Sequence, residues 1–179
     1  MAAELPQRID VAGTTCSLYA QDFTHVIAKC SVDRIFIDHR KVGFFQIRLL
    51  PVLVAQGVRL ELHQTLESID ALRKVQSNLT PQMTRHSLEW RDVEINFPGT
   101  NGPHIHAQSA RMVQASGPVV CQLERVTIEG KGANWQLAKA DLLTEPESRK
   151  LMGRTAEGFL FQLNLLTGEI ICIQPNTRP

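Results

Sequence analysis

The residues that could carry chemistry in this sequence are six histidines, four cysteines and a cluster of basic and aromatic side chains. His104 and His106 form the only close histidine pair. Positions i and i+2 of a strand share one face, so both rings could reach one metal ion. No carboxylate or cysteine stands at a short spacing that would supply a third ligand. A polar strand face is the favoured interpretation, and we predict no metal site.

The four cysteines, Cys16, Cys30, Cys121 and Cys172, are widely spaced and form no C-x-x-C pair. This spacing argues against a zinc site or a redox motif and favours small buried hydrophobic residues. Disulfides stay open if the compartment is oxidising. The sequence also lacks G-x-S-x-G, a Gly-rich phosphate loop before a helix, and H-E-x-x-H. We therefore predict that the chain is not an enzyme and holds no cofactor; a hydrolase using Cys or His is the least favoured hypothesis.

Basic and aromatic residues meet in the run from Asp38 to Lys41, which Phe44 and Phe45 follow. Clusters of this composition can contact phosphates or lipid headgroups. The favoured interpretation is an ordinary charged turn followed by core aromatics.

Length and charge set the outer bounds. The chain has 179 residues and a formal net charge of +1. A chain of this length can bury roughly 70% of its unfolded surface and needs no disulfide or metal to fold. The charge balance argues against a nucleic-acid partner recognised through net charge. No signal peptide, membrane anchor or apolar run of about 20 residues is visible, so a soluble chain is expected.

The hydrophobic pattern predicts the elements that must position any site. Apolar residues alternate with polar ones through residues 7–63, which is typical of antiparallel strands. Apolar residues recur at steps of three and four over residues 65–79, which predicts one helix. Turn residues then separate short alternating runs through residues 87–174. We predict one mainly β domain over residues 1–179, an antiparallel β-jellyroll, taco-like roll or sandwich, with one helix near residues 65–79.

Alternation places the apolar residues of the C-terminal strands on common faces. These faces would line an apolar trough if the sheet stays open, or fill an ordinary core if it closes. The residues concerned are Val119, Cys121, Leu123, Val126, Ile128, Trp135, Leu137, Phe159, Phe161 and Leu163.

Three short motifs run from His104 to Gly153: Ile105-x-Ala107-x-x-Ala110, Leu123-x-x-Val126-x-Ile128, and Trp135-x-Leu137-Ala138-x-Ala140. This stretch resembles the periplasmic lipopolysaccharide-export β-jellyroll family of OstA-like and LptC-like proteins. The segment from Gly43 to Leu62 is similar to AsmA-like envelope proteins.

The resemblance implies a lipid or lipopolysaccharide partner held in the apolar groove of an open β-roll. It also implies a second β-roll protein paired at a sheet edge, and a periplasmic or envelope location. Cell-envelope lipid transport is therefore the first functional hypothesis. The alternative is a non-catalytic β-sandwich that acts as a scaffold or a protein-interaction domain.

Overall fold

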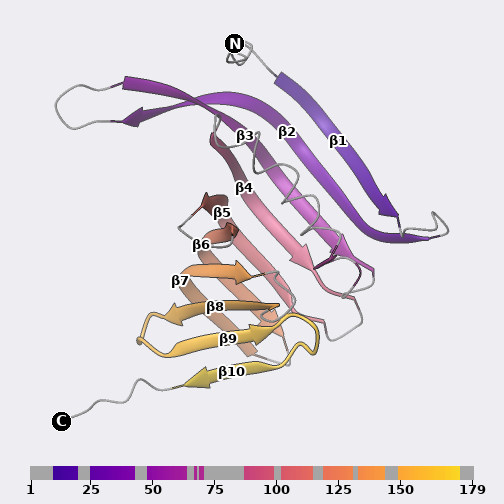
Figure 1. Cartoon of the computed structure of the whole chain (residues 1–179), viewed down its shortest axis with the longest axis vertical. Coiled ribbons are helices and arrows are strands. Elements are labelled where there is room, and N and C mark those ends of the chain that lie inside the picture. Colours follow the sequence, from indigo (N-terminus) through magenta and orange to yellow (C-terminus); the bar gives the residue numbers. More distant parts are fainter. Residues whose placement is uncertain are drawn as a thin grey trace.

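The computed structural model describes residues 10–19, 25–42, 48–63, 67, 69–70, 87–98, 102–114, 119–130, 133–143 and 149–173. The described residues form ten strands (Figure 1). Their bounds are β1 Asp10–Tyr19, β2 Val26–Val42, β3 Arg48–Leu62, β4 Ser87–Asn96, β5 His104–Gln114, β6 Val119–Gly130, β7 Ala133–Leu143, β8 Lys150–Thr155, β9 Leu160–Asn164 and β10 Ile170–Ile173.

All ten strands belong to one sheet, in which they follow one another in chain order. Neighbouring strands are antiparallel except β3 and β4, which are parallel. Parallel neighbours need a long crossover rather than a hairpin, and residues 63–86 supply its length here. β1 and β10 are the two outermost strands, so the sheet is open at both ends.

The prediction of a mainly β fold is confirmed, and the predicted C-terminal strands match β4 to β10 to within a few residues at each end. The predicted helix at 65–79 lies largely outside the described residues, although Glu67, Ile69 and Asp70 have helical backbone. The charged turn predicted at 38–41 is wrong, because β2 continues through it to Val42. None of the described segments forms a helix with the length and apolar character needed to cross a lipid bilayer.

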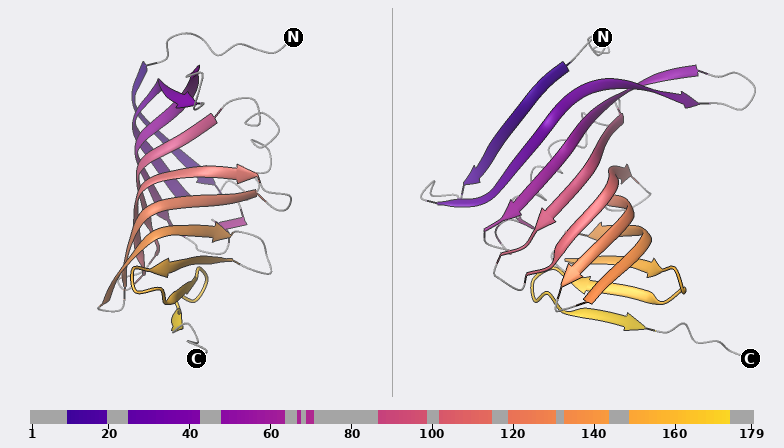
Figure 2. Two further views of the ribbon diagram at one scale, coloured as in Figure 1. Left: turned by 90° about the vertical axis from the view of Figure 1, so that its left-hand side faces the viewer. Right: turned by 180° about the vertical axis from the view of Figure 1, so that it is seen from behind.

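The sheet is strongly twisted and curved, and β8–β10 run in a different direction from β1–β3 (Figure 2). We call β1–β3 the N-terminal sector and β4–β10 the C-terminal sector. The N-terminal sector contains the longest strands, β2 with 17 residues and β3 with 15. The C-terminal sector ends in the shortest strands, β9 with 5 residues and β10 with 4.

A row of residues interrupts the pairing across strands β1 to β7. Each residue of this row has no pairing partner on the neighbouring strand, whereas the residues before and after it are paired. The row, which we call the kink row, consists of Gly13, Asp33, Gly57, Asp92, Gln108, Arg125 and Ala138. Gly13, Gly57, Asp92 and Arg125 have positive φ angles of 47, 66, 58 and 52°. The kink row inserts one extra residue per strand, as a bulge does.

The extra residue changes the spacing of the apolar side chains from two to three as each strand crosses the kink row. On β6, Leu123 and Val126 are both buried, while Glu124 and Arg125 between them are less so. On β7, Leu137 and Ala140 are likewise buried and the two residues between them are exposed. The apolar side chains therefore stay on one face of the sheet along the whole strand.

The opposite face carries cross-strand ion pairs. Arg91 of β4 contacts both Glu89 (2.8 Å) and Asp38 of β2 (2.7 Å), and Arg40 of β2 contacts Glu89 (2.6 Å). Val54 of β3, whose register partner on β4 is Glu89, is 0% exposed although it points to this face. One face of the sheet is thus apolar, and the other carries the ion pairs together with the buried side chains of Val52 and Val54.

Candidate functional site

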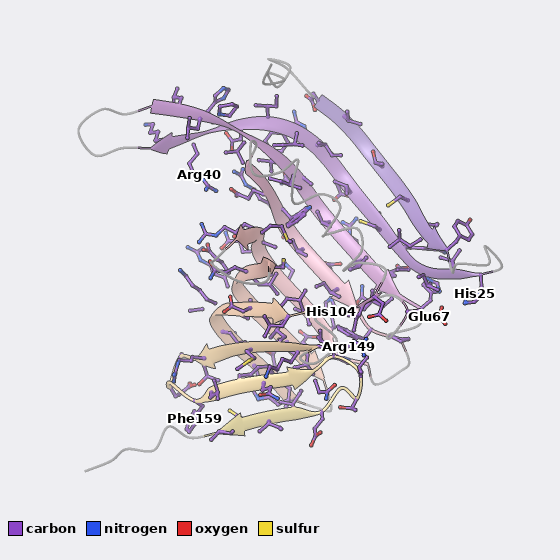
Figure 3. The ribbon with its side chains drawn as sticks, viewed as in Figure 1. His25, Arg40, Glu67, His104, Arg149 and Phe159 are labelled. Atoms are coloured by element: carbon purple, nitrogen blue, oxygen red, sulfur yellow. The ribbon has the colours of Figure 1, made fainter. Side chains whose placement is uncertain are left out.

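The structure places the residues predicted to line a trough on the apolar face. Leu123, Val126, Ile128, Leu137, Phe161 and Leu163 belong to the main hydrophobic core, and each is at most 2% exposed. Cys121 and Trp135 are partly buried and pack against that core. Phe159 is half-buried and lies at the hairpin between β8 and β9 (Figure 3). The side chain of Val119 lies outside the described part of the chain.

These residues pack against one another and fill the C-terminal sector. The rings of Trp135 on β7 and Phe161 on β9 are 5.7 Å apart and tilted by 54°. Leu151 of β8 and Leu163 of β9 are register partners and are both 0% exposed. Such packing is that of a protein interior, which has few voids larger than a water molecule.

The crossover between β3 and β4 also contributes to this interior. Ile69 is 2% exposed and belongs to the same core. Beside it, Asp70 accepts a hydrogen bond from Arg149 Nη2 at 2.9 Å, and Glu67 lies 3.6 Å from His25. Arg149 and Glu67 lie on the same side of the molecule in Figure 3. These contacts fix the described part of the crossover against β2 and the start of β8.

The apolar face is open to solvent at the other end of the sheet. Val11, which lies on that face of β1, is 45% exposed, and its register partner Ile35 on β2 is partly buried. Cys16 is exposed on the same face. Sequence reasoning did not select these residues as candidates. The apolar spacing Val32-x-x-Ile35, which crosses the kink row as Leu123-x-x-Val126 does, was the signal that could have found them.

The histidine pair lies on the charged face. His106 Nε2 is 3.3 Å from Asp92 Oδ1, and His104 is partly buried opposite Glu129. Among the described residues, no group of three or more His, Cys, Asp or Glu side chains is placed to hold a metal ion. The described part of this face offers ion pairs rather than a metal-ligand set.

Asp38 and Arg40 of the basic-aromatic cluster form ion pairs with β4. Hydrogen bonds from Arg91 and from the backbone of His39 hold the pKa of Asp38 below its ordinary value. Burial would raise the pKa of Glu89, but hydrogen bonds from Arg91 and Arg40 outweigh it, and its pKa lies below its ordinary value. Phe44 and Phe45 lie outside the described residues.

Fold and site together define an open, single-sheet β protein with one apolar face, filled in the C-terminal sector and solvent-accessible at β1. The sequence matches no protein-family model and no curated protein sequence.

Proposed function

We propose that the chain binds lipid on the apolar face of the N-terminal sector, with the acyl chains against the sheet and the headgroups in water. The observation that carries the proposal is the exposure of Val11, 45%, in the same register row as Phe161, which is 0% exposed. An apolar face left wet at one end is a surface whose burial by acyl chains is favourable, at roughly 25 cal/mol per Å2.

Transport of lipopolysaccharide or another envelope lipid is the role that the sequence resemblance supports. The two open edges support it further. An outer strand presents unpaired backbone groups, which a second β-roll protein can satisfy by extending the sheet. The proposal assigns no catalytic residue, and it places the protein in the cell envelope.

The competing proposal is a scaffold with a filled core and no ligand. The packing of the C-terminal sector favours it, because the residues first expected to line a groove are core residues. The two proposals differ at β1. The lipid-binding proposal requires an apolar ligand in contact with the exposed apolar side chains of this strand, whereas the scaffold proposal requires no ligand there.

The test is photo-crosslinking combined with lipid extraction from the purified full-length protein. A photoreactive amino acid at Val11 should crosslink to phospholipid or lipopolysaccharide in micelles. The same residue at Ala12, which is exposed on the opposite face of β1, should not. V11D should abolish crosslinking from a photoreactive residue at position 35, whereas A12D should not. If position 11 crosslinks no more than position 12, and no lipid is extracted, the scaffold proposal replaces this one.

A further inference from the structure

Two cysteines face each other across the outermost strand pair. Cys16 of β1 and Cys30 of β2 are direct register partners in the antiparallel pairing. Directly opposed residues of antiparallel strands point to the same side of a sheet. Both thiols therefore lie on the apolar face, with Cys16 exposed and Cys30 partly buried.

The spacing of opposed positions suits a disulfide. Opposed residues of an antiparallel pair have Cα atoms about 4.5 or 5.5 Å apart, depending on whether they exchange hydrogen bonds. Disulfides span Cα separations of about 4.4 to 6.8 Å, a range that includes both kinds of pair. Burial raises the pKa of Cys30 to about 11, and the Cys16 thiol, in hydrogen-bonding contact with it, adds to the rise.

We propose that Cys16 and Cys30 form a reversible disulfide that fastens β1 to the sheet. β1 is the outermost of the described strands, and among them it pairs only with β2. Nearly all of its residues are exposed, so little side-chain burial holds it in place. A covalent bond from β1 to β2 adds the stabilisation that side-chain packing does not supply. The chain folds without this bond, and oxidation then locks the edge strand.

The chemistry is thiol–disulfide exchange with a small-molecule disulfide such as oxidised glutathione. The thiolate of the exposed Cys16 attacks one sulfur of the oxidant, which breaks the S–S bond and releases one thiol. The thiolate of Cys30 then attacks Cys16 Sγ in the mixed disulfide and releases the second thiol. The protein loses two protons and two electrons, and the oxidant is reduced to two thiols.

The other two cysteines serve as internal controls. Cys121 of β6 is opposite Met112 and Leu142, and burial raises its pKa to about 12, with Asp141 adding to the rise. Cys172 is exposed on β10, where it is opposite Phe161. Neither has a cysteine as a register partner.

The experiment treats the reduced full-length protein with oxidised glutathione and measures its mass. In C172S, which lacks the other exposed thiol, closure should lower the mass by about 2 Da, the two hydrogens lost, with no glutathione retained on Cys16 or Cys30. Trypsin should then release residues 9–29 linked to residues 30–34, because cleavage follows Arg8, Lys29 and Arg34. The wild type should give the same linked peptides and also carry glutathione on the exposed Cys172. C30S should stop at the mixed disulfide on Cys16.

Hydrogen exchange gives a second measurement on the wild-type protein alone. Oxidation should slow amide exchange in β1 and β2 and leave β5–β9 unchanged. Two results would overturn the proposal: a stable glutathione adduct on Cys16 of the wild type with Cys30 still reduced, or a disulfide that links Cys16 to another cysteine or to a second copy. Unchanged exchange in β1 after closure would overturn its role as a fastening.

Discussion

One register row of the sheet passes from solvent to a dry interior. Val11 on β1 is 45% exposed, Ala55 on β3 is 5% exposed, Leu123 on β6 is 1% exposed and Phe161 on β9 is 0% exposed. All four lie on the same face, and the row ends beyond Phe161 at the exposed Cys172 of β10. The comparison shows that an apolar face is not by itself a core; it becomes one where other parts of the chain cover it.

The cover comes from the C-terminal sector and from Ile69 of the crossover between β3 and β4. The short strands β8, β9 and β10 change direction, and the buried ring of Phe161 lies against the partly buried ring of Trp135. The turn before β10 completes it, because Gly168 approaches Pro103 near the start of β5. The apolar face of β1 is less covered: Val11 is 45% exposed and Cys16 is exposed, whereas Ala28 of β2 is 0% exposed and belongs to the core.

The largest expected effect comes from placing a charge at the two ends of this row. F161D should lower the free energy of unfolding by at least about 4 kcal/mol, because it removes a buried ring and buries an unpaired carboxylate. L137D should behave in the same way. V11D should change it by less than about 0.5 kcal/mol, as exposed substitutions usually do. Urea unfolding followed by circular dichroism measures all three variants.

This contrast fails if V11D unfolds the protein as F161D does. The apolar face at β1 would then be part of the core, and the lipid-binding proposal would lose its surface. F161L serves as the matched control, since it keeps an apolar side chain at the same place and should cost less than F161D.

The second prediction concerns the kink row, which crosses both sectors. Gly57 has a φ of +66°, and an added Cβ would overlap the Asp33 carboxylate and lie 2.9 Å from the Asp33 Cβ. Asp33 is also held by Arg59 at 2.8 Å. G57A should therefore lower the free energy of unfolding by about 2 kcal/mol, from left-handed backbone strain together with the displaced ion pair.

Two neighbours in the row separate these causes. Gly13 has a φ of +47° and nothing within 4 Å of an added Cβ, so G13A should cost only the backbone strain, about 1 kcal/mol. Arg125 has this backbone strain in the native protein, at a φ of 52°. R125G should relieve it and stabilise the fold by about 0.5 kcal/mol, since glycine loses more backbone entropy on folding and this offsets part of the gain. Equal losses for G57A and G13A would show that Asp33 moves without cost.

The kink row also explains what the sequence could and could not predict. The motifs Ile105-x-Ala107-x-x-Ala110 and Leu123-x-x-Val126-x-Ile128 are strands whose apolar spacing changes from two to three where the row crosses them. The strands were predictable because alternation holds on both sides of the break. The break itself was not predictable, because Gly57 has the appearance of a turn residue and Arg125 has no local signal for its positive φ.

The site was harder to predict for a different reason. Alternation correctly places Leu123, Leu137 and Phe161 on the apolar face, but burial depends on which strands curl over them. That curling brings β7 and β9 into contact across β8, and no local pattern specifies it. The same limit applied to the turn expected at residues 38–41. Arg40 and Asp38 in this segment are hydrogen-bonded to Glu89 and Arg91, which lie about fifty residues further along the chain.

A smaller effect than that of G57A is expected where the two sectors join on the charged face. Glu89 of β4 is held by Arg91 and by Arg40 of β2, and its pKa lies below the ordinary value of 4.5. A carboxyl with a lowered folded pKa stabilises the fold above its unfolded pKa, and this contribution is lost as the pH falls through the folded value.

E89Q should therefore lower the free energy of unfolding at pH 7 by about 1 kcal/mol, since the arginine partners are partly solvated. As the pH falls below 4.5 and through the lower pKa of Glu89 in the folded protein, the difference between variant and wild type should shrink towards zero. Urea unfolding across this range measures it, with E129Q, at an exposed position of β6, as the control. If the wild type and E89Q lose stability in parallel below pH 4.5, the ion pairs of Arg40 and Arg91 with Glu89 do not join the sectors energetically, and the N-terminal strands are held to β4 by backbone pairing and the apolar face alone.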